Sequence, residues 1–411
     1  MAKLLWTQKQ DIGPPPRYAH AMVYDAARRR VLLFGGDSLA GHLFNDTWEW
    51  DGSDWTQVED LGPGPRGGHS MAYDSTRNRT VVFGGNSGGA DLNDTWEWDG
   101  SSWTQLQNAG PGPRAFHGTA FDAARGRVVL FGGQPLSGGA PFQDTWEWDG
   151  ENWSQLEDSG PAPRSGHAMT YDRVRQRTVL FGGAGTGAAF SDTWEWDGTS
   201  WRHVQDVGPR GAVGAAMVFR TKVSTLFGGI TTSAGAAPRE LFGLTWEWNG
   251  AHWTARQDMG VGPRLGHAMA FDSARGRVVL FGGVTVPPES TGAASSLKGD
   301  TWEHADVTSP GGNGGGGTVT GMLASVSAAP DPVMRGGSLT VTVTLAGPLN
   351  VTVAALVDVL GVRQLMIPPA VLSGSTQFLI PRVLPMPLPA SLPIVATGPD
   401  GVSVSTTVTV L

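Results

Sequence analysis

Apolar and polar positions along roughly the first three quarters of the chain follow a recurring pattern of short strands. In each unit a segment such as HAMVYD alternates, RVLLF is an apolar run ending in Gly-Gly, TWEW alternates again, and WTQV follows. Alternation is typical of half-buried strands, and short apolar runs bounded by glycine are typical of buried ones. An Asp-Gly or Asn-Gly pair between the last two segments favours a hairpin turn. The pattern predicts four antiparallel strands per unit.

The unit occurs six times with nearly constant spacing. The sequence FGG recurs with its first glycine at Gly35, Gly84, Gly132, Gly182, Gly228 and Gly282. An arginine stands 18 residues before each of these glycines: Arg17, Arg66, Arg114, Arg164, Arg210 and Arg264. All 17 tryptophans fall in the same register. Large rings at fixed offsets in every copy indicate packing between repeats rather than a platform for a ligand.

Repeated four-stranded units suit a propeller, because neighbouring blades then cover both faces of each sheet. Residues 6–17, WTQKQDIGPPPR, match residues 55–66, WTQVEDLGPGPR, whereas the sixth unit lacks this outer strand. We therefore expect the N-terminal strand to complete the sixth blade, which would remove an open sheet edge.

The double glycine, the aromatic pair and the Pro-x-Pro-Arg segment resemble the kelch family over residues 3–307. This resemblance implies an all-β fold with a six-bladed kelch β-propeller. A kelch propeller followed by a β-rich tail also resembles galactose oxidase, whose radical chemistry requires a tyrosine–cysteine crosslink. The chain has no cysteine, so it is not expected to be a copper-radical oxidase, and shared fold alone assigns no function.

The composition changes after residue 307. The segment TSPGGNGGGG predicts a flexible linker over residues 308–317. Residues 318–411 contain no tryptophan and carry β-rich stretches such as GSLTVTVTLAG, which look similar to bacterial immunoglobulin-like β-sandwich modules. The predicted domains are a propeller over 1–307, the linker, and a small immunoglobulin-like domain over 318–411.

Charge and hydropathy exclude some partners and leave the compartment open. The formal net charge is −8 and the basic residues are scattered, which argues against nucleic acid as a partner. No apolar run reaches the roughly 18 residues of a membrane helix, and the N-terminus lacks the apolar core of a signal peptide. Localisation is left unknown: the domain types slightly favour an extracellular or cell-surface setting, with a cytoplasmic one as the alternative.

Five histidines recur three residues after the arginine: His20, His69, His117, His167 and His267. A ring of imidazoles near a propeller axis could hold a metal. The alternative is a structural hydrogen bond to the aspartate before each TWEW segment. The fifth unit carries Val213 and Leu244 at these two positions and so loses both groups together. We therefore expect structural pairing, with no metal and no cofactor.

The arginines, counted in all six units, and the glutamates of TWEW are expected to lie toward one face. Six arginines at a channel mouth would repel each other unless neutralised. Either the glutamates pair with them, or they bind an anionic ligand or acidic peptide, as arginines at this position do in some kelch proteins.

Connections between strands 4 and 1 and between strands 2 and 3 emerge on one side of an antiparallel blade. Length variation is confined to the 2–3 loops, of which 230–243 and 284–299 are the longest. Variable loops on a regular scaffold commonly carry binding. The chain is therefore predicted to be a non-catalytic recognition or scaffold protein that binds a protein segment or a carbohydrate on this face. The alternative is a propeller enzyme, such as a lyase, hydrolase or sugar mutarotase, using channel-mouth histidines and arginines. The predicted ligand-binding residues are Arg17, Arg66, Arg114, Arg164, Arg210, Arg264, Arg239, Glu240, Glu289 and Lys298.

Overall fold

A computed structural model of the chain divides it into two compact units, one spanning Leu4–Val307 and the other containing Thr308–Leu411. The structure describes residues 4–306 except 10–11, 60, 108, 158, 188, 206, 232–239, 257 and 286–294, and, beyond them, the seven strands that lie between residues 323 and 409. The predicted linker, 308–317, lies outside the described residues.

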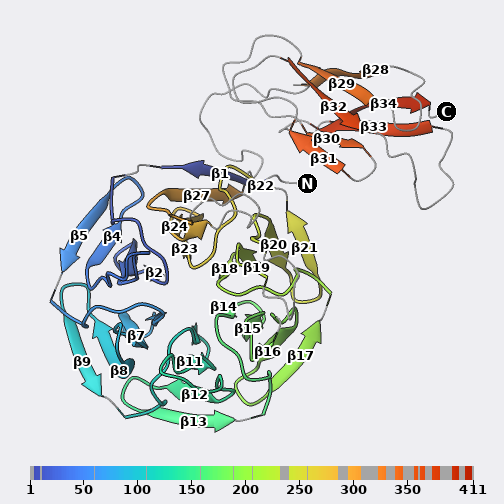
Figure 1. Cartoon of the computed structure of the whole chain (residues 1–411). Coiled ribbons are helices and arrows are strands. Elements are labelled where there is room, and N and C mark those ends of the chain that lie inside the picture. Colours follow the sequence, from blue (N-terminus) through green and yellow to red (C-terminus); the bar gives the residue numbers. More distant parts are fainter. Residues whose placement is uncertain are drawn as a thin grey trace. The chain divides into compact units, whose positions relative to one another are not determined.

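The first unit is a ring of six antiparallel four-stranded blades (Figure 1). Blade 1 contains β2 (Ala21–Asp25), β3 (Arg30–Phe34), β4 (Thr47–Trp50) and β5 (Trp55–Glu59). Blade 2 contains β6 (Ser70–Asp74), β7 (Arg79–Asn86), β8 (Asp91–Trp98) and β9 (Trp103–Gln107). Blade 3 contains β10 (Gly118–Asp122), β11 (Arg127–Phe131), β12 (Thr145–Trp148) and β13 (Trp153–Glu157). Blade 4 contains β14 (Ala168–Asp172), β15 (Arg177–Phe181), β16 (Thr193–Trp196) and β17 (Trp201–Gln205). Blade 5 contains β18 (Ala216–Arg220), β19 (Val223–Phe227), β20 (Thr245–Trp248) and β21 (Trp253–Arg256).

The N-terminal strand closes the ring, as predicted. Blade 6 is built from β23 (Ala268–Asp272), β24 (Arg277–Phe281), β27 (Thr301–Asp306) and β1 (Leu4–Gln8). In this sheet β1 lies beside β27 (Figure 1) and pairs antiparallel with it. In this register Trp6 is the partner of His304. The short β22 (Asp258–Met259) pairs in parallel with the other side of β1. The short strands β25 (Val284–Thr285) and β26 (Ser296–Leu297) pair in the 2–3 loop of this blade.

Each junction between neighbouring blades has its own hydrophobic core. At the junction of blades 1 and 2, for example, Leu32 and Phe34 pack with Met71, Val82 and two tryptophans of blade 2. The second tryptophan of each TWEW segment is almost fully buried in these cores. In blades 1 to 5 the outer-strand tryptophan donates its indole N–H to a threonine of the preceding blade, for example from Trp103 to Thr47 at 2.9 Å. The tryptophans therefore pack the blades together, as predicted.

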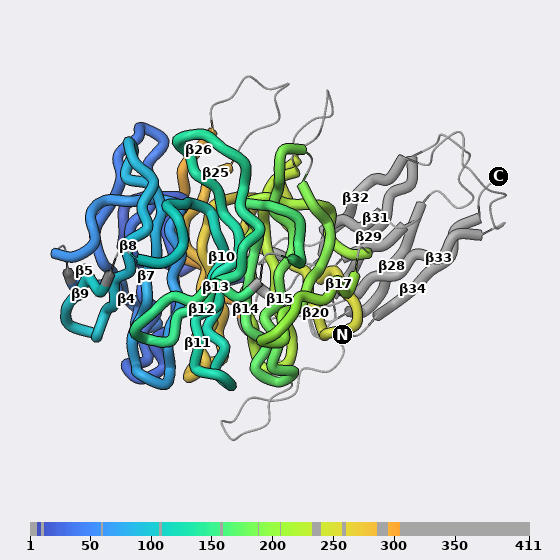
Figure 2. Tube along the Cα trace, turned by 90° about the horizontal axis from the view of Figure 1, so that it is seen from below, coloured from blue at the N-terminus to red at the C-terminus, as the bar shows by residue number. Residues whose placement is uncertain are grey.

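A belt of six backbone hydrogen bonds encircles the propeller axis. Each blade contributes one residue just before its first strand, and each donates its N–H to the carbonyl of the blade before it. The donors, at 2.7–2.9 Å from their acceptors, are Ala19, Gly68, Phe116, Gly166, Gly214 and Gly266. All six have positive φ, between 54° and 71°, which explains why four of them are glycine. In the edge-on view of Figure 2 the strands run between the two faces of the ring; the belt lies toward the face that carries the 4–1 connections.

In the second unit the described strands form two antiparallel sheets. One contains β28 (Leu323–Ala329), β29 (Ser338–Leu345) and β32 (Ser373–Leu379). The other contains β30 (Leu356–Val359), β31 (Val362–Leu365), β33 (Ser391–Thr397) and β34 (Ser403–Thr409). The all-β prediction is thus confirmed, whereas the immunoglobulin-like identity of this unit stays a prediction.

Candidate functional site

In five blades the repeat arginine is buried and held on all sides. Arg66, which is 2% exposed, donates from Nη1 and Nη2 to the two carboxylate oxygens of Asp94 at 2.6 and 2.8 Å. It also donates to the carbonyl oxygens of Gly84 and Gly64, each at 3.0 Å. The same arrangement joins Arg17 to Asp46, Arg114 to Asp144, Arg164 to Asp192 and Arg264 to Asp300. A bidentate pair of this kind fixes the start of strand 3 to the 4–1 connection.

These arginines are structural groups, which corrects the expectation that they converge on a channel mouth and face a ligand. They pair with aspartates, so the expected pairing with the TWEW glutamates is also wrong. Burial alone would raise the pKa of Asp94, but the hydrogen bonds and charge of Arg66 outweigh it and lower this pKa below its ordinary value. The glutamates of blades 2, 3, 4 and 6 pair instead with arginines of the 1–2 turns on the opposite face, as Arg77 does with Glu97 at 2.5 Å.

The repeat histidines lie inside the blade junctions. His69 packs edge-on against Phe34 of the preceding blade, with ring centroids 5.3 Å apart. Burial first, and then the nearby charge of Arg66, lowers the pKa of His69 to about 3, so the ring is neutral. The expected histidine–aspartate pairing is wrong, because the aspartate belongs to the arginine. Within the part of the chain that the structure describes, no three metal-ligating side chains are placed to share an ion.

Blade 5 differs from the other blades in its local register. Its 1–2 turn has two residues between β18 and β19, where the turn between β6 and β7 has four, so the expectation that length varies only in the 2–3 loops is wrong. Counting 18 residues back from Gly228 therefore reaches Arg210, but the backbone places Ala212 at the arginine position. The carbonyl of Ala212 accepts a hydrogen bond from Gly183 N, just as the carbonyl of Arg66 accepts one from Gly36 N.

Blade 5 has thus lost all three side chains of the buried cluster. Ala212 replaces the arginine, Ala215 replaces the histidine, and Leu244 replaces the aspartate. The placement of Val213 at the histidine position, and the presence of the arginine in all six blades, were therefore wrong. Arg210 lies two residues earlier and pairs with Glu240 at 2.8 Å; their side chains are 73% and 60% exposed. An ion pair this open to water contributes little to stability.

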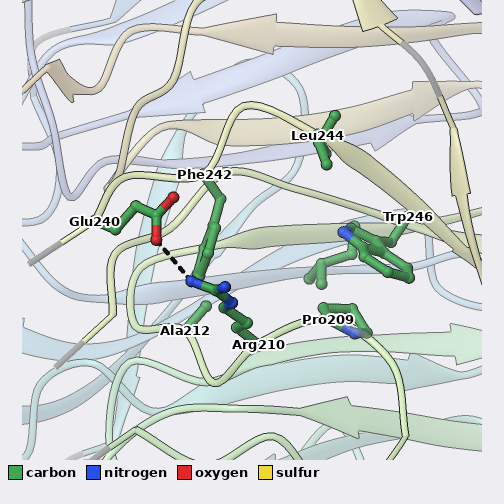
Figure 3. Close-up of a pocket in the computed structure, with 9 residues that line it drawn as sticks. Pro209, Arg210, Ala212, Glu240, Phe242, Leu244 and Trp246 are labelled. Atoms are coloured by element: carbon green, nitrogen blue, oxygen red, sulfur yellow. Dashed lines mark hydrogen bonds and ion pairs between the residues drawn. The ribbon is translucent and has the colours of Figure 1, made fainter. Parts of the chain in front are cut away.

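A cavity of about 260 Å³ lies where the arginine–aspartate pair lies in the other blades. Figure 3 shows its lining: the 4–1 connection, the end of the 2–3 loop, and Trp246 of β20. The lining residues are Pro209, Arg210, Ala212, Leu226, Gly228, Glu240, Phe242, Leu244 and Trp246. The side chain of Leu244 is 50% exposed, so it does not replace the missing pair.

The cavity keeps the hydrogen-bonding groups that serve the pair elsewhere. Trp96, the blade 2 counterpart of Trp246, donates its indole N–H to Asp94 at 2.7 Å. Gly84, the counterpart of Gly228, accepts from Arg66. In blade 5 no described side chain occupies either role. The cavity therefore has an unmatched donor at Trp246 Nε1 and an unmatched acceptor at Gly228 O.

A second cavity, of about 310 Å³, lies on the axis and is lined by residues of the first strands of all six blades. Its lining includes Tyr24, Tyr73 and Tyr171 together with Arg173, but none of the repeat histidines. The channel is therefore not a histidine-lined site.

Of the remaining predicted ligand residues, the structure describes Lys298 but not Arg239 or Glu289. Lys298 is half-buried, and its carbonyl accepts a hydrogen bond from Arg17 N at 3.2 Å. Arg239 and Glu289 lie outside the described residues, as do the central parts of both long 2–3 loops. The suggestion that these loops form one wall of a site stays a prediction. The sequence signal that pointed to blade 5 was Leu244, which stands where every other unit has an aspartate.

Comparisons with known proteins agree with this architecture. Residues 1–154 match the family described as the KLHDC2/KLHL20/DRC7 Kelch-repeats domain. The solved structure titled "Structure of YjhT" superposes with a TM-score of 0.56 at 18% identity, covering 70% of this chain and 95% of that one; a likeness at this identity shows the fold alone. No curated protein matches. Among the described residues, no helix is long and apolar enough to cross a membrane. The first unit is therefore a six-bladed β-propeller with a kelch-type fold, and its residues 1–154 carry the match to the kelch family model.

Proposed function

We propose that this chain is a non-catalytic recognition protein that binds a protein segment on the face formed by the 4–1 and 2–3 connections. The observation that carries the proposal is the blade 5 cavity on this face. In the other five blades a buried arginine and its aspartate partner fill the same position. Kelch propellers typically bind proteins, and a concave site with a few polar groups is the usual form of a binding pocket.

Exposed apolar side chains also support a binding role for this face. Leu39 and Leu136 in the 2–3 loops, and Leu61 and Val207 in the 4–1 connections, are all more than 40% exposed. The turns of the opposite face contribute only Val174 to the large apolar side chains exposed among the described residues. Exposed apolar groups gathered on one face mark a surface that contacts other molecules.

The propeller-enzyme alternative gains no support from the described residues. It relied on histidines and arginines at the channel mouth. The five repeat histidines are neutral and buried between blades, and five of the six predicted arginines are saturated by aspartate and carbonyl oxygens.

The test is a selection of binders from a random-peptide display library on the full chain. Affinity of the selected peptides is then measured for Leu39→Ser and Phe242→Ala on the proposed face, and for Val174→Ser on the opposite face as the matched control. We expect weaker binding to the first two variants and unchanged binding to the third. Peptides that respond only to Val174→Ser would overturn the assignment of the face.

A further inference from the structure

The other blades indicate which chemical group the blade 5 cavity would bind. In blades 1, 3 and 4 the buried guanidinium stacks on an aromatic ring of the 2–3 loop: Arg17 on Phe44, Arg114 on Phe142 and Arg164 on Phe190, at 4.0–4.1 Å from the ring centroids. The five guanidiniums also donate to the carbonyl of the first glycine of FGG, at 2.8–3.0 Å. The space around each guanidinium, between the 2–3 loop and the carbonyl of the first glycine of FGG, is thus a niche for one planar cation.

The blade 5 niche keeps the walls but lacks the buried cation; its own Arg210 lies at the mouth, where the side chain is 73% exposed. Phe242 N donates to Gly229 O at 2.9 Å, as Phe44 N donates to Gly36 O at 2.9 Å, so the two rings start from equivalent backbone positions. Gly228 supplies the carbonyl, and Ala212 leaves the space of a full arginine side chain. The lost negative charge has a substitute at the cavity mouth, where the carboxylate of Glu240 forms an exposed ion pair with Arg210.

We propose that the blade 5 cavity binds the guanidinium of an arginine side chain from a partner protein segment. The incoming guanidinium stacks on Phe242, donates to Gly228 O and pairs with Glu240. Trp246 Nε1 is left to donate to a carbonyl of the same segment. This assignment rests on the proposed function, because it places the partner on the same face and names the side chain that anchors it.

The chemistry favours arginine over lysine. A planar guanidinium stacks on an aromatic face and donates in two directions at once, whereas an ammonium is a compact, strongly hydrated point charge. The geometry also favours a charged group over its neutral analogue, because Glu240 contributes an ion pair only to a cation.

The probes are three blocked tripeptides that differ only in the central residue: arginine, lysine or citrulline. Binding to the full chain is followed by NMR through the indole N–H signal of Trp246, assigned with Trp246→Phe. We expect the arginine peptide to shift this signal and to bind at least about fivefold more tightly than the other two, in line with one exposed cation–π contact.

The decisive variant is Ala212→Arg with Leu244→Asp, which restores the arginine–aspartate pair of the other five blades. It adds one positive and one negative charge, so the net charge stays the same. It should fold and melt no lower than the natural chain, because five blades already accommodate this pair, and it should lose the arginine peptide. Phe242→Ala, which removes the ring without filling the cavity, should also lose it.

Full binding of the arginine peptide to both variants would overturn the proposal, as would equal affinity for citrulline and arginine, or no shift of the Trp246 signal. The proposed function has a separate readout. Display-selected peptides that lose affinity for Leu39→Ser but bind the restored double variant normally would retain the face and eliminate the arginine niche.

Discussion

The contribution of the N-terminal strand to closing the ring can be measured with one substitution. Trp6 is 2% exposed and lies in the core between blades 5 and 6, with its ring centroid 5.6 Å from that of Phe227 and 4.9 Å from that of His304. Truncating a buried tryptophan to alanine costs about 3–5 kcal/mol. Trp6→Ala should therefore lower the free energy of unfolding of the propeller by about that amount.

Trp201→Ala is the matched control. Trp201 holds the same position in blade 4, where the outer strand is continuous with its own blade. Its ring packs 5.2 Å from that of Phe131, and its indole N–H donates to Thr145 at 2.8 Å. Trp6 Nε1 has no partner among the described residues. The control should thus lose the same packing plus one hydrogen bond, which contributes about 1 kcal/mol.

Urea unfolding followed by tryptophan fluorescence reports on the propeller alone, because all 17 tryptophans lie between residues 6 and 302. We expect the two variants to be destabilised to within about 2 kcal/mol of each other. Deleting residues 1–9 should be more damaging, and a synthetic peptide of residues 1–16 should restore part of the loss. A cost below about 1 kcal/mol for Trp6→Ala, with the full cost for Trp201→Ala, would refute ring closure by this strand.

Three further predictions follow from the same contacts. The buried histidines have pKa values far below 6.5 in the folded state, so as the pH falls from 6.5 toward 3 only the unfolded chain takes up their protons. Each histidine should therefore lower the free energy of unfolding progressively as the pH falls through that window, and urea midpoints that do not change between pH 7 and 5 would contradict this. Arg114→Ala should destabilise by about 3–5 kcal/mol, because it leaves Asp144 as a buried charge without its partner, whereas Arg114→Ala with Asp144→Ala should recover part of the loss; equal melting temperatures for the single variant and the natural chain would argue against a structural role. Gly132→Ala should cost more than about 1 kcal/mol, because φ is +62° and the new Cβ would lie 2.6 Å from the carbonyl oxygen of Arg164; an unchanged midpoint in urea would show that the turn relaxes.

Much of the fold could be predicted from spacing alone. The six FGG units gave the number of blades, and the match of residues 6–17 to residues 55–66 identified the strand that closes the ring. Both inferences work because every blade of a propeller packs against its neighbours in the same way. Residues at the same position in each repeat therefore have the same structural surroundings. The tryptophans were interpreted correctly for the same reason.

The candidate site was harder to predict, because charge pairing depends on which side chains meet in space. The sequence shows that arginine, aspartate, glutamate and histidine recur, but not which of them are partners. The 1–2 turn of blade 5 is also two residues shorter than the others. The 18-residue spacing from Gly228 therefore pointed to Arg210 instead of Ala212 as the repeat arginine position. Only the backbone hydrogen bonds of Ala212 show that the arginine is missing there and that a cavity has replaced it.

The most direct test of recognition on this face is amide hydrogen exchange of the full chain with and without a display-selected peptide. We predict that protection concentrates in the 4–1 connection at Arg210–Val213 and in the 2–3 loop from Glu240 to Trp246. Protection confined to the 1–2 turns, such as residues 75–78 and 173–176, would contradict the account.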